Sequence, residues 1–207
     1  MEHWDARWRR TWQDLALPLP ESKHASGLAD LLARYREPQR HYHTLQHLGE
    51  SFAVLDSLLH TAAQPGELAL ALWFHDAIHD VRRHDNEQRS AELALACLAA
   101  VGATPPLMRR VWELILATRH HEAASDPDLA ILLDADLAIL GAPRVRFAEY
   151  EDQVRTEYAH VPQDAWAEGR AKVLHRFLAR PRIYTTPAIF TRLEDQARTN
   201  LRCSLAI

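Results

Sequence analysis

Apolar side chains recur at helical spacing in nearly every segment of this 207-residue chain, and no segment keeps the two-residue alternation of a half-buried strand. Trp4, Trp8, Trp12 and Leu15, for example, fall on one stripe, which we interpret as a packing face. The expected loops are short, and no composition change, repeat or low-complexity linker divides the sequence. We therefore expect residues 1–207 to form one all-α domain of about eight to ten helices.

Start and stop signals indicate where several of these helices lie. Thr44 is placed to act as the N-cap of a helix, and Asp85 or Asn86 is placed to cap another. Asp126 and Pro127 form a cap followed by a proline at the first helical position, so they predict a helix through "DLAILLDADLAIL" that stops at Gly141. Another helix should open at the Pro105-Pro106 pair, and three more should follow over roughly 143–160, 163–179 and 187–202.

Composition narrows the class of protein further. The net charge of −4 gives no general attraction to nucleic acid or anionic membranes, so we expect no nucleic acid polymer as partner. Two cysteines cannot build a disulfide framework, the N-terminus lacks the apolar region of a secretory signal, and no run approaches the ~18 apolar residues of a membrane span. These features predict a cytoplasmic protein without a membrane partner, and they leave the oligomeric state open.

Histidines and aspartates gather at or near the ends of apolar segments. Neutral imidazole and carboxylate are ligands that suit zinc, manganese, iron and, with fewer nitrogens, magnesium. The segments are "HYHTLQH", "WFHDAIHD", "TRHHEAASD" and "LLDADLAIL", and their candidate ligands are His41, His43, His47, His75, Asp76, His79, Asp80, His120, His121, Asp134 and Asp136.

Spacing and burial sharpen this set. His75 and His79 are four residues apart, as are Asp76 and Asp80, so a continuing helix would present both pairs on adjacent stripes. Asp136 is surrounded in sequence by leucines, and a buried carboxylate without a partner is costly whereas one bound to a cation is readily explained. For Asp134 the simpler interpretation is an exposed carboxylate.

The motifs "RHYHTLQHL", "WFHDAIHD", "DNEQRSAE", "LATRHH", "DADLAILG" and "EGRAKVL" occur in this order over most of the chain. This set resembles the HD superfamily of metal-dependent phosphohydrolases. The resemblance implies that His47, His75, Asp76 and Asp136 hold a divalent metal ion. It also implies that His120 and His121 are the candidates for a second metal or for phosphate. Position 79, where Tyr or Glu is expected in relatives, is His here, which leaves its role open.

The resemblance implies hydrolysis of a phosphorylated small molecule, possibly a nucleotide, by metal-activated water. The ion would be Mn, Fe, Zn, Ni, Co or Mg, since such a ligand set accepts several metals. We expect Asp80 or His79 to position or deprotonate the water, and Asp80 to do so without holding the metal. His43 would bind the phosphate or protonate the leaving oxygen. Substrate contacts are expected from Arg83, Asn86 and Glu87, because arginine can clamp phosphate.

Three other functions fit part of the pattern. "HDAIH" is one methylene short of the H-E-x-x-H motif of zinc peptidases, although that interpretation leaves His47 and Asp136 unexplained. A non-catalytic domain that senses or holds a metal and nucleotide would use the same ligands. A two-iron oxygenase would need six protein ligands, including His120 or His121.

Overall fold

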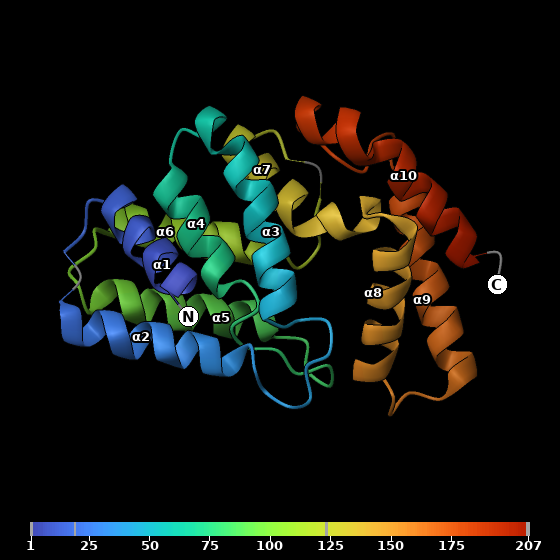
Figure 1. Cartoon of the computed structure of the whole chain (residues 1–207), viewed down its shortest axis with the longest axis horizontal. Coiled ribbons are helices and arrows are strands. Elements are labelled where there is room, and N and C mark those ends of the chain that lie inside the picture. The colour runs from blue at the N-terminus through green and yellow to red at the C-terminus, as the bar shows by residue number, and fades with distance from the viewer. Residues whose placement is uncertain (1, 19, 123, 206–207) are drawn as a thin grey trace.

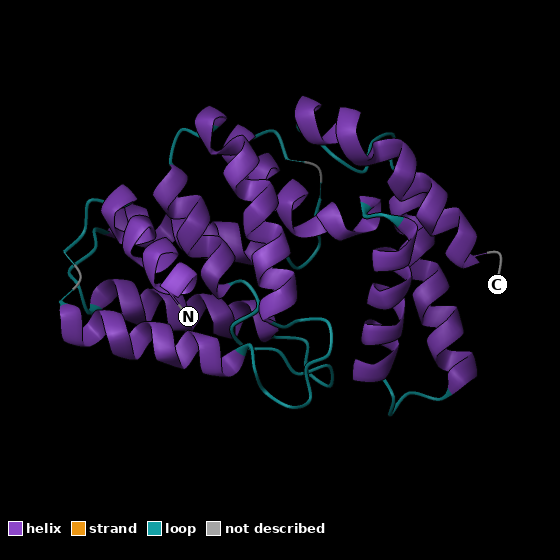
Figure 2. Cartoon of the chain, in the orientation of Figure 1, coloured by secondary structure: helices purple, strands orange, loops and turns teal. Residues whose placement is uncertain are grey.

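Ten α-helices and two 3₁₀ segments make up the described part of the chain, residues 2–18, 20–122 and 124–205 of a computed structural model. No strand occurs in these ranges, as Figure 2 shows, so the expected all-α class is confirmed. The elements are α1 (Glu2–Asp14), α2 (Glu21–Arg34), α3 (Leu45–Leu58), η1 (Leu59–Thr61), α4 (Pro65–Phe74), α5 (Asn86–Ala99), α6 (Pro105–Ala117), α7 (Pro127–Asp136), η2 (Leu137–Gly141), α8 (Arg144–Glu157), α9 (Gln163–Leu178) and α10 (Pro187–Leu205).

Local start signals behave largely as expected. The Thr44 side chain accepts a hydrogen bond from the backbone N–H of Gln46, and Asp126 accepts from the second and third residues of α7. Asp85 occupies the cap position of α5, but its side chain makes no hydrogen bond to the helix, because its carboxylate pairs with Arg83 instead. The expected helix through Gly141 is divided, since α7 ends at Asp136 and the chain continues as 3₁₀ helix.

Helix α4 is the centre of the first half of the molecule. Its residues from Leu68 to Phe74 are all buried, in agreement with a sequence that is apolar on every side. The Trp4, Trp8 and Trp12 stripe of α1 is also buried, and the rings of Trp4 and Trp8 lie 5.5 and 5.3 Å from that of Trp73. The tryptophan stripe is therefore a packing face, as predicted.

The second half of the molecule lies beside this bundle in Figure 1. Helices α8 and α9 form a hairpin tied by bonds from Arg170 to Tyr150 and Glu151, and α10 packs across η2 and α9. Two loops, residues 35–44 and 75–85, lie between the bundle and α8. The chemistry-bearing sequences "HYH" and "HDAIHD" belong to these loops.

Buried carboxylates fasten backbone segments across the fold. Asp134, interpreted from sequence as an exposed carboxylate, is only 1% exposed and accepts hydrogen bonds from the backbone of Thr185 and Thr186. That interpretation was wrong because Asp134 faces the segment that leads into α10. Glu194 holds the backbone N–H groups of Ile183 and Tyr184 in the same way. The Asp134 bonds attach this segment to α7, and the Glu194 bonds attach it to α10.

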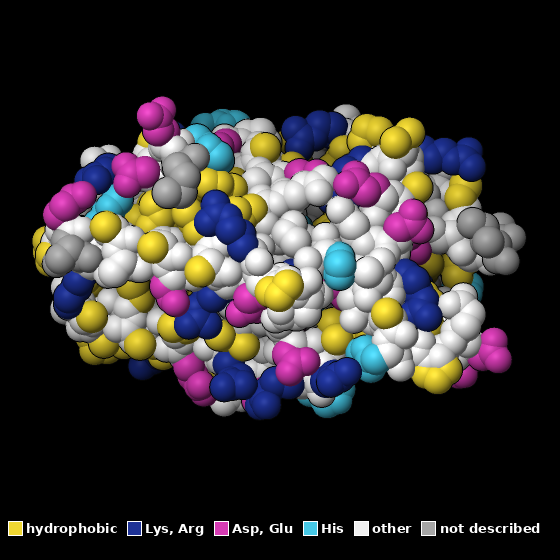
Figure 3. Space-filling model, turned by 60° about the horizontal axis from the view of Figure 1, so that its bottom comes forward, with side chains coloured by type: hydrophobic (Ala, Val, Ile, Leu, Met, Phe, Trp, Pro, Cys, Tyr) yellow, Lys and Arg dark blue, Asp and Glu magenta, His cyan; other side chains and the backbone are white. Residues whose placement is uncertain are grey.

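The surface mixes both signs of charge. On the face shown in Figure 3, acidic and basic side chains are interspersed rather than gathered by sign. Within the described ranges, no helix has the length and apolar character needed to cross a membrane.

Candidate metal centre

Helix α4 ends at Phe74, directly before the first histidine of "HDAIHD". His75 is the C-cap, and residues 75–85 form an irregular loop. The expectation that His75 and His79, and Asp76 and Asp80, share helical stripes was therefore wrong. The chain leaves the helix within the motif, so each of these side chains has its own direction.

Four of the predicted ligands nevertheless converge. His47 comes from the first turn of α3, His75 and Asp76 follow α4, and Asp136 is the last residue of α7. His47 Nε2 lies 3.2 Å from His75 Nε2 and 3.1 Å from Asp136 Oδ1, and His75 Nε2 lies 3.3 Å from Asp136 Oδ1. Asp76 Oδ2 lies 3.0 Å from His75 Nε2 and 3.5 Å from His47 Nε2. Side chains from α3, from the end of α7 and from the loop after α4 thus meet at one point.

These distances fit a shared cation. Two donor atoms about 2.1 Å from one ion lie about 3.0 Å apart at a right angle and about 3.4 Å apart at a tetrahedral angle. The contacts among His47, His75 and Asp136 fall in that interval. The C-terminal ends of α4 and α7 also point here, and the negative ends of their dipoles favour a positive charge.

Neighbouring groups orient the ligands. His75 Nδ1 lies 2.8 Å from the Leu72 carbonyl oxygen, which can only accept, so Nδ1 carries the proton of the neutral ring and Nε2 is the nitrogen that a metal ion can bind once it is deprotonated. Ser51 Oγ lies 3.3 Å from His47 Nδ1. The second oxygen of Asp136 lies 2.7 Å from His121 Nε2. His121 adopts φ of 49°, in the left-handed region that few residues other than glycine adopt.

In the protein without an ion, the same clustered side chains shift one another's pKa values. Burial alone would lower the pKa of His75, but the negative charges of Asp76 and Asp136 outweigh it and hold that pKa well above its ordinary value. Burial would raise the pKa of both carboxyls, but the charge of His75 holds the Asp76 and Asp136 pKa values well below the ordinary range. Protonated histidine is thus the counter-charge that a divalent ion would replace.

Arg40, which sequence reasoning missed, secures the loop that carries the candidate ligands His75 and Asp76. Its side chain is 1% exposed and donates to the carbonyl oxygens of Asp76, Ala77 and His43 at 2.5, 3.0 and 3.3 Å. An ordinary "REPQR" segment gives no sign of this role, because the partners are backbone atoms distant in sequence.

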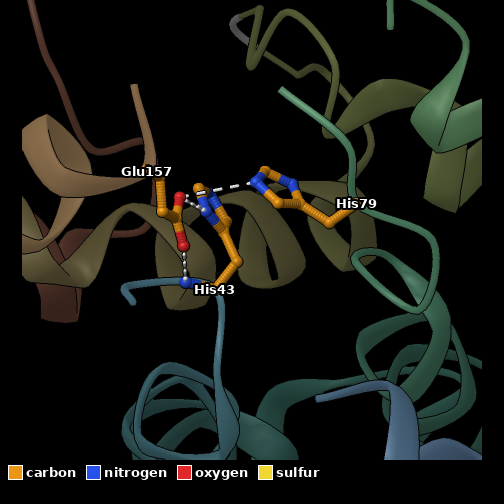
Figure 4. Close-up of side chains that lie close together, drawn as sticks. All are labelled: His43, His79 and Glu157. Carbon is orange, nitrogen blue, oxygen red and sulfur yellow. Dashed lines mark hydrogen bonds and ion pairs between the residues drawn. The ribbon is translucent and has the colours of Figure 1, made fainter. Parts of the chain in front are cut away.

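A second group of side chains lies beside the first and is shown in Figure 4. It contains His43, His79 and Glu157, the last residue of α8, and each offers a ligand atom within 4.8 Å of the others. Both this group and the group of His47, His75 and Asp136 are therefore composed of side chains that could hold a metal ion. Glu157 was also missed, since a single glutamate in "RTEYAH" has no distinguishing pattern.

The two groups face a cavity of about 640 Å³ between the bundle and the α8–α9 hairpin. Asp76, Asp136, His43 and His79 line it from the bundle side. Its remaining wall combines cationic and aromatic side chains, among them Arg83, Arg119, Arg170, Arg176, Tyr150, Tyr158, Trp166 and Phe177.

Only some of the remaining predicted site residues lie at the cavity. Arg83, Asn86 and Glu87 line the cavity, although Arg83 is paired with Asp85. His120 is exposed and does not join His121 at Asp136. The two histidines therefore do not act as the pair that the sequence suggested.

Asp80 is exposed, and its Oδ1 accepts from the backbone N–H of Arg82. It is not among the residues that line the cavity. The helical offset that would have placed this carboxylate beside the ion is absent because α4 has already ended. The reason for assigning the base to Asp80 is thereby removed.

Comparisons of the chain with models of protein families, with curated proteins and with solved structures give no match. The geometry of the two groups and of the cavity is therefore the basis for any functional assignment.

Proposed function

We propose that this chain is a metal-dependent phosphohydrolase of the HD type, acting on a phosphorylated small molecule. The observation that carries the proposal is the convergence of His47, His75, Asp76 and Asp136 on one point beside a cavity with cationic walls. This is the ligand set implied by the ordered sequence motifs, and it assembles although the helical spacing argument for part of it failed.

The ion would be held by the Nε2 atoms of His47 and His75 and by carboxylate oxygens of Asp76 and Asp136. A mixed set of two nitrogens and two carboxylates suits Mn, Fe, Zn, Ni or Co and, less well, Mg. When bound, such an ion lowers the pKa of a water ligand and offsets charge on phosphoryl oxygens. His121 would keep Asp136 oriented through their 2.7 Å contact.

The arginines of the cavity favour an anionic substrate. Among the described residues, neither Arg119 nor Arg176 has a carboxylate partner, so their guanidinium groups remain available to a phosphate. Trp166 and Tyr158 offer aromatic surface on the same wall. A phosphate joined to an apolar or aromatic group, as in a nucleotide, is compatible with this combination.

The peptidase alternative loses its structural premise. It needs His75 and His79 on successive turns of one helix, but the helix ends before both, and His79 packs on His43. The sensor alternative uses the same ligands as the phosphohydrolase, so turnover rather than binding distinguishes the two.

Metal analysis tests the proposal first. Wild-type protein should carry a divalent ion, His75→Ala and Asp136→Asn should lose it, and the exposed His60→Ala should keep it. Equal metal content in all four would refute the site. A screen of phosphorylated metabolites with added manganese then tests turnover. Binding without turnover across several metals would indicate the sensor, and peptide cleavage without phosphatase activity would indicate the peptidase.

A further inference from the structure

The Glu157 carboxylate is committed to hydrogen bonds on both oxygens. Its side chain is 0% exposed, and Oε1 accepts from the backbone N–H groups of His41, Tyr42 and His43 at 2.8, 2.8 and 3.0 Å. Oε2 lies 2.7 Å from His43 Nδ1. A carboxylate that already accepts three donors is held in its ionised form, which can only accept. His43 Nδ1 must therefore carry the proton, and the lone pair of a neutral His43 is at Nε2.

His79 packs against one face of the His43 ring. The two ring centroids lie 3.8 Å apart with 27° between the planes, and Figure 4 shows the two rings next to one another. His79 Nε2 is buried, has no hydrogen-bond partner and lies 3.4 Å from Glu157 Oε2. The stack and the carboxylate together leave the His43 ring little rotational freedom.

The same stack argues against a metal ion shared by these two histidines. An imidazole nitrogen binds a metal about 2.1 Å away along a lone pair in the ring plane. Planes inclined by 27° with centroids 3.8 Å apart do not meet so close to either ring. The geometry therefore favours an oriented histidine over a second metal site.

His43 also has access to the reaction site. It keeps 21% side-chain exposure, lines the cavity, and its ring centroid lies 5.9 Å from that of the predicted ligand His47. Among the described residues, His43 Nε2 has no hydrogen-bond partner. A free acceptor thus lies beside the metal centre, where Asp80 was expected to supply one.

We propose that His43 is the base of the reaction and that Glu157 is the residue that positions it. This inference rests on the proposed function. The attacking water transfers a proton to His43 Nε2 while its oxygen forms a bond to phosphorus. The bond from phosphorus to the leaving oxygen breaks, and its electron pair leaves with that oxygen. Glu157 faces the imidazolium so formed, and the proton then passes to solvent or to the leaving oxygen.

Glu157→Gln is the diagnostic change. The amide oxygen can keep the three backbone bonds, but the amide N–H₂ would face His43 Nδ1, so the ring must move its proton to Nε2 and lose its free acceptor. We expect kcat to fall at least about 100-fold with little change in KM, metal content or thermal midpoint. Glu194→Gln is the matched control, because Glu194 is another buried carboxylate that holds backbone N–H groups, and it lies outside the cavity lining.

Substrate choice separates a base from an acid. The leaving group of p-nitrophenyl phosphate departs without a proton. The leaving group of phenyl phosphate is more basic and needs one. Glu157→Gln and His43→Ala should therefore slow both substrates equally, and added imidazole should restore part of the His43→Ala rate. A histidine-ring NMR spectrum should report the proton on Nδ1 in wild type and on Nε2 in Glu157→Gln.

Several results would overturn the inference while the proposed function stands. These are wild-type turnover by Glu157→Gln, a larger loss on phenyl phosphate alone, or two ions in wild type with one lost in Glu157→Gln. The last would identify a second metal site. Absence of any phosphatase activity in wild type would instead refute the proposed function, and this inference with it.

Discussion

Replacing Arg40 by methionine should destabilise the protein at the loop that carries the candidate metal ligands His75 and Asp76. The guanidinium is buried and donates hydrogen bonds to the carbonyl oxygens of Asp76, Ala77 and His43, so it joins two loops that are distant in sequence. Methionine fills a similar volume without a donor, which leaves three carbonyl groups without their partner.

The size of the effect follows from these bonds. Hydrogen bonds to charged groups contribute about 1.5–3 kcal/mol each, and the longest of the three, at 3.3 Å to His43, should contribute least. Allowing for relaxation and for water entering the gap, we expect a loss of about 3–5 kcal/mol in the free energy of unfolding. For a chain of this length each kcal/mol lowers the thermal midpoint by about 2–4 °C, so the midpoint should fall on the order of 10 °C.

The assay is thermal unfolding of metal-free protein, because a bound ion would raise the midpoint by mass action. Arg7→Met is the control, since Arg7 pairs with Asp56 at the surface and such pairs contribute about 0–1 kcal/mol. Arg40→Lys should recover part of the loss by reaching one carbonyl. If Arg40→Met lowers the midpoint no more than Arg7→Met does, the account of the loop is refuted.

Three further predictions concern the ion and the substrate. Metal binding should release a proton near neutral pH and weaken as the pH falls, because Asp76 and Asp136 hold the His75 pKa well above its ordinary value against the effect of burial. Calorimetry in buffers of different ionisation enthalpy measures the released proton. Binding heats that do not depend on the buffer would contradict this prediction. Asp80→Asn should turn over within a few-fold of wild type, and a 100-fold loss of kcat would restore Asp80 as the base. Arg176→Gln should raise KM for a phosphorylated substrate about 10-fold without changing metal content, and an unchanged KM would exclude this arginine from the phosphate site.

Local signals in the sequence predicted much of the fold because their physical causes are local. The bonds from Thr44 and Asp126 to the first turns of α3 and α7 involve residues two or three positions away. Burial of Trp8 and of α4 follows from apolar spacing alone. The candidate ligand Asp136 was also recognisable, because it combines a carboxylate with an apolar helical context, whereas His47 was assigned through the resemblance of the ordered motifs.

Glu157 could not be recognised in the same way. Its importance comes from the backbone N–H groups of residues 41–43, which are more than a hundred positions away in sequence. The chain uses the same device where Asp128 holds Ala63 and Gln64 and where Asp134 holds Thr185 and Thr186. A carboxylate in this role needs only backbone partners, so it imposes no side-chain pattern on the sequence that it binds.

The end of α4 shows how such distant partners override a local pattern. A helix continuing through "HDAIHD" would bond the Asp80 N–H to the Asp76 carbonyl oxygen. Both groups have other partners here, since Asp76 O accepts from Arg40 and Asp80 N–H donates to Asn86 Oδ1 at 3.1 Å. The four-residue spacing is therefore present in the sequence, but the helix that would place these side chains on one face is absent. The end of the helix lets His79 leave the line of His75 and stack on His43. The break in the helix therefore divides one run of six residues between the candidate metal centre and a stack on His43.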